Sequence, residues 1–289
     1  MRITTLVDNQ PSPNDSQLTA EWGLSLCVEL NGRHILIDMG ASDAFARNAE
    51  RLSIDVAAID VAILSHHHYD HGGGLRRFLE LNDHAPIYLG VAPDGDPTVK
   101  LLGFLRKYIG LDQALLAQHA HRFHFVHERT EVLPGVFVLP DIGGQHARPA
   151  GNRFLYLKRD SALAPDDFRH EIVVAIREHD ALVVLTACSH NGLLNMVETA
   201  SAEFPGLPIR AVVGGFHLAK LPPFRGISGT ERAVADIGRA VLAAGIETTW
   251  TGHCTGRKAF AVLHDVMGDR VREIHTGSRI DLQASSHAP

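Results

Sequence analysis

A buried strand that runs into a cluster of histidines constrains the fold of this chain more than any other feature. Residues 58–66 read AIDVAILSH and are mostly apolar, which is typical of a strand covered on both faces of a sheet. Four histidines and one aspartate then fall within residues 66–71. Polar groups gathered at the end of a buried strand oppose burial unless they have partners. We therefore expect a layered α/β fold in which this strand end carries a functional site.

The same arrangement recurs three times in the second half of the chain. His190, His217 and His253 each follow an apolar segment, in ACSHNGL, VVGGFHL and WTGHCTG. Ligand-binding residues of layered α/β folds gather at the C-terminal edge of the strands. The sequence therefore predicts that these three histidines meet the first cluster in space.

The spacing H-x-H-x-D-H is suited to metal binding. His66 and His68 are two residues apart and point to the same side of an extended segment, whereas His67 points away. Asp70 and His71 follow where the chain turns into a helix. Imidazole and carboxylate ligands favour zinc, with manganese and iron as alternatives. The cluster therefore predicts one or two divalent metal ions, and the competing interpretation is a solvated polar loop.

The pattern of apolar residues predicts strands and helices in alternation. Asn31-Gly32, between two apolar runs, indicates a tight hairpin. The expected strands cover 2–8, 22–30, 33–38, 58–66, 86–90, 171–176, 181–190, 209–217 and 247–256, and the expected helices cover 42–52, 73–82, 191–204, 228–245 and 257–268. No linker-like stretch separates the two halves. We expect a single domain over 1–282, built from two packed sheets with helices outside, and a flexible tail at 283–289.

Composition and charge limit the partners of the chain. The net charge is −6 with histidine neutral, so the basic surface that a nucleic-acid backbone requires is absent from the sequence. No stretch approaches the ~20 apolar residues of a membrane span. Three cysteines, Cys27, Cys188 and Cys254, form no paired framework, which favours a reducing cytoplasm. We expect a cytoplasmic protein that acts on a small molecule and has neither nucleic acid nor membrane as a partner.

Three segments leave alternatives open. Residues 99–118, VKLLGFLRKYIGLDQALLAQ, are either a homodimer contact or a helix that forms a lid over the site. His119, His121, His124 and His127 form either part of a lid or a solvated surface run. The glycines at 72–74 either offer backbone N–H groups to an anion or allow a tight turn.

The motifs together resemble a known family. S-H-x-H-x-D-H-x-G-G resembles the signature of the metallo-β-lactamase superfamily, and ILIDMG (35–40) resembles its first motif. The set LSHHHYDHGGGL, ACSHNGLLN, GGFHL and TGHCTG is similar to one subfamily of metal-dependent hydrolases, which includes the archaeal dihydropterin-methyl ribofuranosylaminobenzene phosphate synthase. The resemblance spans roughly residues 2 to 282 and is more specific for the fold than for the substrate.

The resemblance implies an αββα four-layer sandwich of two mixed sheets with helices outside and a metal site at one sheet edge. It carries the ligand role over to His66, His68, Asp70 and His71, and to His253 as the last ligand histidine. Beside this set, His190 is expected to be a ligand. The family's bridging aspartate after the strand ALVVL is absent, and Cys188-Ser189-His190 stands there instead. This leaves the occupancy of the second metal open.

The remaining residues of these motifs have supporting roles in the same reading. Asp38 is expected to accept the outer N–H of a ligand histidine, with a plain strand-end turn as the alternative. Cys188 is placed behind the ligands as a weaker ligand candidate, and Cys254 is expected to be a buried neighbour. His217 is expected at the rim as a proton donor or substrate contact. Tyr69 is a packing or lid residue, and His67 is given no role.

Metal-activated water is the chemistry that such a site supplies. The first hypothesis is a metal-dependent hydrolase of a small ester-like or phosphorylated substrate, with Asp70 orienting the water as well as binding metal. The second is a transferase similar to the pterin synthase, in which an aromatic nucleophile displaces diphosphate. The third is a metal-binding protein without turnover.

Overall fold

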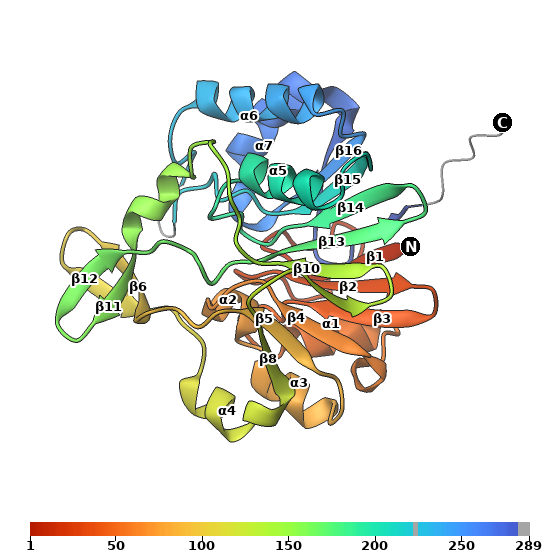
Figure 1. Cartoon of the computed structure of the whole chain (residues 1–289), viewed down its shortest axis with the longest axis vertical. Coiled ribbons are helices and arrows are strands. Elements are labelled where there is room, and N and C mark those ends of the chain that lie inside the picture. Colours follow the sequence, from red (N-terminus) through yellow and green to blue (C-terminus); the bar gives the residue numbers. More distant parts are fainter. Residues whose placement is uncertain (222–224, 283–289) are drawn as a thin grey trace.

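The computed structural model of the protein describes residues 1–221 and 225–282, and the expected tail at 283–289 lies outside this range. Two seven-stranded sheets pack face to face, with helices on both outer sides (Figure 1). This is the αββα sandwich that the sequence predicts. No helix within the described residues has the length and apolar character needed to cross a membrane.

The first sheet combines antiparallel and parallel pairing. Its strands lie in the order β18 (Arg279–Asp281), β1 (Arg2–Val7), β2 (Ser25–Leu30), β3 (Arg33–Ile37), β4 (Val61–Leu64), β5 (Ile87–Gly90) and β8 (Phe123–Val126). The strands β3, β4, β5 and β8 run parallel to one another. The hairpin between β2 and β3 turns at Asn31 and Gly32, which have φ values of 50° and 76° as a tight two-residue turn requires.

The second sheet repeats this design. Its strands lie in the order β17 (Val271–Glu273), β16 (Thr248–Thr251), β15 (Ile209–Gly214), β14 (Ala181–Leu185), β13 (Val173–Glu178), β10 (Val136–Leu139) and β9 (Thr130–Leu133). The four strands β14 to β17 are parallel. The C-terminal ends of parallel strands therefore meet at one edge of each sheet.

The core consists of three apolar layers that follow the alternation of the strands. Residues such as Ile63 and Val183 fill the space between the two sheets. On the outer face of the first sheet lie α1 (Ala44–Arg51) and α3 (Leu75–Leu81), with Phe45 and Phe78 fully buried. On the outer face of the second lie α5 (Leu193–Glu203), α6 (Glu231–Ala243) and α7 (Arg257–Met267), as Figure 1 shows.

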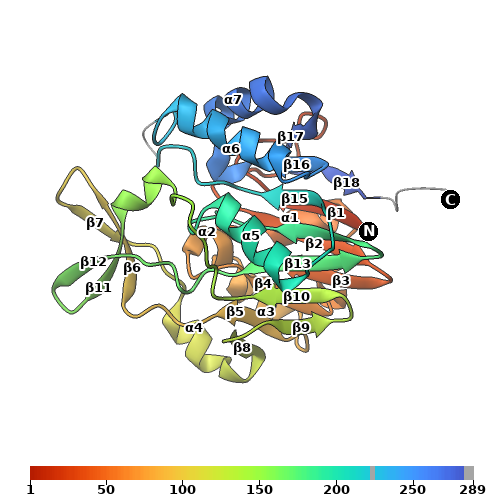
Figure 2. The ribbon, with the colours of Figure 1, turned by 45° about the horizontal axis from the view of Figure 1, so that its top comes forward.

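A third sheet is the main difference from the expected architecture. β6 (Asp96–Leu101), β7 (Leu105–Tyr108), β11 (Leu155–Arg159) and β12 (Ala162–Pro165) form a separate four-stranded antiparallel sheet, in the order β12-β11-β6-β7. Figure 2 shows it projecting from the body of the protein beside α2 (Tyr69–Gly72). The prediction of a lid helix over 99–118 is wrong for most of this segment. Gly103 reverses the chain at φ 79°, so the first half forms a hairpin, and only α4 (Gln113–Gln118) is helical.

Short 3₁₀ helices complete the secondary structure. They cover Val56–Ala58, Ala120–Arg122, Ala150–Phe154, His253–Thr255 and Gly268–Arg270. The strands are shorter than predicted because polar residues at their C-terminal ends leave the sheet. β4 stops at Leu64, β15 at Gly214 and β16 at Thr251, so the histidines that follow each strand lie in loops above the sheet edge.

The glycine run after the histidine cluster serves close packing. A Cβ on Gly73 would collide with the carbonyl oxygen of Ala41, and one on Gly74 with that of Met39. The N–H groups of Gly72 and Gly73 donate to the carbonyls of His68 and Gly40, at 3.1 and 2.9 Å. Two of the three N–H groups are therefore engaged within the protein, which favours the tight turn over an anion site.

We predict that Gly73→Ala lowers the free energy of unfolding by about 1–3 kcal/mol, because the backbone of Ala41 cannot yield to the new methyl group. Gly143→Ala is the matched control, since a Cβ there meets nothing within 4 Å. The control should remain within about 1 kcal/mol of the parent protein. Urea unfolding measures both variants, and equal stability of the two would contradict the packing argument.

Candidate metal centre

Loops from five places in the chain bring the expected ligand residues together. His66 and His68 lie in the loop after β4, and Asp70 and His71 lie on the single turn of α2. The remaining residues follow the ends of β14, β15 and β16, and they are Cys188, His190, His217 and His253. All eight residues are buried, with exposures between 0 and 8%. The convergence that the sequence predicts for the strand-end histidines is therefore present.

Three histidines form the first group of donor atoms. His66 Nε2 and His68 Nδ1 are 3.0 Å apart. His66, His68 and His190 each place one ring nitrogen within 4.8 Å of the others. His190 Nε2 is buried and has no hydrogen-bond partner among the described residues. Three imidazole nitrogens this close together are suited to hold one cation when none of them carries a proton.

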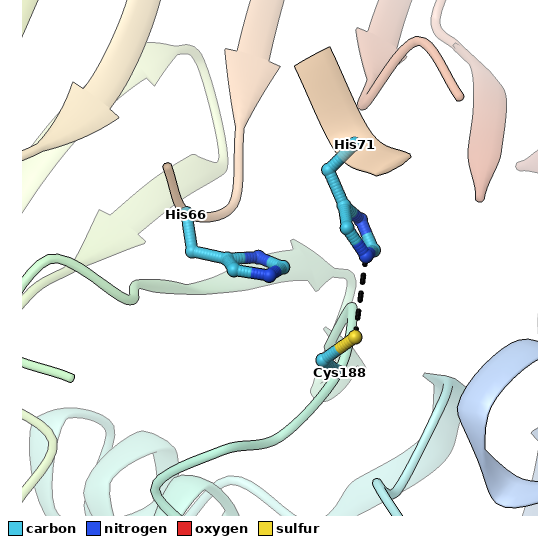
Figure 3. Close-up of side chains that lie close together, drawn as sticks. All are labelled: His66, His71 and Cys188. Atoms are coloured by element: carbon cyan, nitrogen blue, oxygen red, sulfur yellow. Dashed lines mark hydrogen bonds between the residues drawn. The ribbon is translucent and has the colours of Figure 1, made fainter. Parts of the chain in front are cut away.

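A second group lies beside the first. Asp70 Oδ2 is 3.9 Å from His71 Nε2 and 3.7 Å from His253 Nε2. The sulfur of Cys188 is 3.2 Å from His71 Nε2 and 3.3 Å from His253 Nε2. Figure 3 shows Cys188 reaching from the loop after β14 toward His71 on α2, with His66 alongside. The donor set of this group is one carboxylate, two imidazoles and one thiol.

Cys188 occupies a position between the two groups. Its sulfur lies within 4.8 Å of donor atoms of His66 and His71 together, and likewise of His190 and His217. The sequence interpretation placed this residue behind the ligands, whereas the structure puts its sulfur among the ligand atoms. A thiol therefore lies between the two donor groups, where the resemblance implies a bridging aspartate.

Outer hydrogen bonds fix the orientation of four of the five histidines of these two groups. His71 Nδ1 donates to Asp38 Oδ2 at 2.7 Å, and His66 Nδ1 lies 2.8 Å from the Ser65 hydroxyl, which itself donates to Asp38. With a proton on Nδ1, each ring directs the lone pair of Nε2 inward. His68 has the opposite orientation, with Nδ1 inward and a buried Nε2 that has no partner among the described residues.

Two asparagines hold the distal histidines in the same way. Asn152 Oδ1 lies 3.2 Å from His190 Nδ1, and its Nδ2 donates to the His190 carbonyl at 2.7 Å. Asn9 Oδ1 lies 3.0 Å from His253 Nδ1, and its Nδ2 donates to the His253 carbonyl at 3.1 Å. Each amide thus forms hydrogen bonds with both the ring and the backbone of one histidine. Its oxygen favours the tautomer with the proton on Nδ1.

Two buried carboxylates complete these grips. Glu171 accepts the His190 N–H at 2.7 Å, and Asp8 accepts the His253 N–H at 2.7 Å. Burial raises the pKa of both carboxyls to about 7. Asp38 has a comparable role for the first cluster, since it accepts from the backbone and hydroxyl of Ser65 as well as from His71.

The protein surroundings keep most of these imidazoles uncharged. Burial, followed by the charges of neighbouring histidines, holds the pKa of His66, His68, His190 and His253 well below the usual value. His71 differs, because Asp38 and Asp70 outweigh its burial and raise its pKa. Neutral imidazoles have the lone pair that a metal ion needs. His66, His68, His190 and His253 therefore fit a divalent metal ion in the neutral form.

His217 lies at the wall of the centre with both ring nitrogens unused. Its ring is 4.3 Å from that of His190, and neither nitrogen has a partner among the described residues. Burial, followed by the charge of His71, lowers its pKa to about 4, so the ring is neutral at pH 7. Of the two expected roles, a contact to substrate fits this state better than proton donation.

The other residues with open assignments lie outside the centre. His67 points away, as expected, with Nε2 3.2 Å from the Gly90 carbonyl. Cys254 is buried beside Cys188 and its sulfur accepts the His217 N–H. The histidine run at 119–127 lines none of the cavity described below, which favours the surface alternative; His121, His124 and His127 are exposed.

Sequence reasoning missed the supporting residues. Asp8, Asn9 and Glu171 directly follow or precede apolar strand segments, a signal that could have marked them, but Asn152 stands in a loop without any distinguishing pattern. His170 was also missed. Its Nε2 is 3.2 Å from Asp166 Oδ2, and its ring centroid is 5.8 Å from that of His68.

A cavity of about 300 Å³ opens onto the donor atoms. One end is formed by Asp70 and Cys188 together with His68, His190, His217 and His253. The walls carry Trp22, Tyr69 and Leu221, the last from the segment after β15. The third sheet and its connections supply the remaining wall residues, which are Val99, Leu101, Lys107, Ile109 and Leu155. The volume is at the lower end of the range for small-molecule sites.

The buried His/Cys donor groups are consistent with a divalent metal site in an αββα sandwich. The sequence model of the metallo-β-lactamase superfamily matches residues 23–163. The chain has the metallo-β-lactamase fold and is similar to this superfamily over that range.

Two relatives extend over nearly the whole chain. The 7,8-dihydropterin-6-methyl-4-(β-D-ribofuranosyl)-aminobenzene-5′-phosphate synthase of Methanocaldococcus jannaschii is 29% identical, over 97% of this chain and 96% of its own. The crystal structure of Tm1679, described as a metal-dependent hydrolase of the β-lactamase superfamily, is 28% identical with a TM-score of 0.79, and the match covers 98% of this chain and 100% of that one. Zn²⁺-bound PqqB from Methylobacterium extorquens shares the fold, at 14% identity and a TM-score of 0.54 over 98% and 100% of the two chains.

We predict that Asn152→Ala and Asn9→Ala each weaken binding of a divalent metal about 10- to 100-fold, because the ligand histidine loses its fixed tautomer. Asn14→Ala is the control, since Asn14 is exposed and its N–H donates to the Ser12 hydroxyl, which is outside this network. Competition with a chromogenic chelator measures the affinity, and circular dichroism checks the fold. Unchanged affinity in both variants would show that the asparagines do not support metal binding.

Proposed function

We propose that the protein is a metal-dependent hydrolase that attacks a small ester-like or phosphorylated substrate with activated water. The observation that supports this most is that outer hydrogen bonds direct several buried imidazoles at one small space. His66, His190 and His253 are each held by an outer partner on Nδ1. His190 Nε2 has no hydrogen-bond partner among the described residues, which a purely structural cluster would avoid because an unpaired buried polar group costs about 1–3 kcal/mol.

The ligands divide into two sets that suit two divalent ions. His66, His68 and His190 would hold one ion, and Asp70, His71 and His253 would hold the other, with the sulfur of Cys188 near both. Nitrogen, sulfur and carboxylate donors of this kind favour zinc, and manganese and iron remain alternatives. The similarity in fold to a zinc-bound protein of the superfamily is consistent with this choice.

When bound, the ions supply a water whose pKa is near 7 and a positive charge that polarises a substrate oxygen. The residues of the chain do the rest. Asp70 lines the cavity, and its carboxylate can orient the attacking water through lone pairs that do not bind metal. The His217 ring is neutral and has no hydrogen-bond partner among the described residues, so it can donate a hydrogen bond to the substrate or accept one from it.

A second candidate function is a transferase that displaces diphosphate with an aromatic amine. The similarity to the archaeal synthase over 97% of this chain favours it. The same ligands would then bind a diphosphate leaving group, and the amine would replace water as the nucleophile. The third interpretation, a metal-binding protein without turnover, has no comparable support from these relatives.

Metal content and activity test the proposal together. We expect the purified protein to contain a divalent metal and to hydrolyse at least one member of a panel of phosphodiesters, lactones and thioesters. His68→Ala should lose most of this metal and the activity, because one nitrogen of the first group disappears, while exposed His121→Ala should keep both. Elemental analysis and product assay measure the outcome.

The panel also separates the alternatives. Release of pyrophosphate from an alkyl diphosphate only when an arylamine is present would favour the transferase. Full metal occupancy without turnover on any substrate would favour the third interpretation. Unchanged metal content in His68→Ala would overturn the assignment of the centre itself.

We further predict that Cys188 binds metal as a thiolate. Burial raises the pKa of the free thiol well above its usual value, but a coordinating thiol is deprotonated by the metal. The cobalt-substituted protein should therefore show a sulfur-to-cobalt charge-transfer band in the near ultraviolet. Cys188→Ser should abolish the band, and Cys254→Ser, a buried neighbour, should retain it. A band that persists without Cys188 would exclude this ligand.

A further inference from the structure

We propose that the site selects a substrate with an apolar body and a separate anionic group, and that Lys107 on the hairpin binds this anion. The proposal deepens the proposed function and rests on it for the identity of the reacting end. Lys107 is thus a second substrate-binding residue. It is separated in sequence from the metal ligands and belongs to the third sheet.

The wall opposite the metal ligands is apolar and well anchored. Ile109 and Leu155 are buried together with Phe168 in a small cluster, and Val99 and Leu221 pack against it. The backbone ties this wall to the metal loop, since the Tyr69 N–H donates to the Ile109 carbonyl at 2.8 Å and His68 pairs with Gly110. An apolar group of the substrate would therefore meet a surface that is fixed relative to the donor atoms.

Lys107 supplies a positive charge to the lining of this cavity. No other lysine or arginine lines it within the described residues. Its Nζ lies over the ring of Tyr69, 5.3 Å from the centroid, and no ion pair holds it in the described chain. The neighbouring cations of the hairpin, Lys100 and exposed Arg106, do not line the cavity.

The charges of the cavity determine which ligand would be favoured. Asp70 is the only carboxylate on its described lining, and it belongs to the metal-binding end. An ammonium group would therefore meet Lys107 and the metal ions without a free anionic partner. A carboxylate, phosphate or sulfonate would instead form a charge-assisted hydrogen bond with Lys107 Nζ. A cavity of about 300 Å³ can enclose one small aromatic or aliphatic body between these two ends.

Two probes with one skeleton test the proposal directly. 8-Anilinonaphthalene-1-sulfonate carries an anion on an apolar body, and N-phenyl-1-naphthylamine is the same body without the sulfonate. Trp22 lines the cavity, and Trp250→Phe makes it the only tryptophan, since the chain has two. Energy transfer from Trp22 to each probe then reports binding to the metal-loaded protein, and the Lys107 variant tests whether the probe lies in this cavity.

In this background, Lys107→Met should weaken binding of the sulfonate about 10-fold and leave binding of the uncharged probe within twofold. Arg106→Met, on the same strand and outside the cavity, should change neither. Unchanged sulfonate binding in Lys107→Met, equal weakening of both probes, or no energy transfer from Trp22 with either probe would overturn the proposal.

This readout does not depend on turnover. A protein that discriminates the two probes through Lys107 but hydrolyses nothing would refute the hydrolase and leave the anion subsite in place. A protein that hydrolyses uncharged esters and shows no effect of Lys107→Met on sulfonate binding would refute the subsite and leave the hydrolase.

Discussion

The structure depends on one constraint, which is that several buried imidazoles must direct free lone pairs at the same small space. Asp38 is central to how this is met. It accepts from Ser65 and His71, and through the Ser65 hydroxyl it also orients His66. These hydrogen bonds join the ends of β3 and β4 to α2, so the packing of the first sheet and the direction of the ring nitrogens are set by the same carboxylate.

The backbone of the centre carries strain that the surrounding contacts must sustain. Asp38, Ser189, His217 and His253 all have positive φ, between 44° and 57°. Non-glycine residues in this conformation cost on the order of 1–3 kcal/mol each. Hydrogen bonds to Asp8, Glu171 and Asp38 hold the loops in place at these positions. The stability of the two sheets therefore supports a geometry that the loops would not adopt alone.

The sequence predicts most strands of the two main sheets and the converging histidines because both depend on local signals, but the short strands β8, β9, β10, β17 and β18 are not predicted. Apolar runs mark the strands, and a histidine after each run marks the sheet edge. The third sheet escapes prediction because β7 is exposed along its length and lacks the alternation of a half-buried strand. The hydrogen bonds of Asn9 and Asn152 to the histidines are not predicted for another reason. They pair with His253 and His190, which are 244 and 38 residues away, and no local pattern encodes such pairs.

Hydrolysis and group transfer place the same demands on the donor atoms and different demands on the cavity wall. A hydrolase must admit water beside the substrate, whereas a transferase must hold a second organic molecule there and exclude water. The wall that decides this is formed by the third sheet, which the Tyr69–Ile109 hydrogen bond links to the ligand loop. The choice between the two reactions therefore lies in the shape and charge of Val99, Leu101, Lys107 and their neighbours, because the ligand set alone is compatible with both.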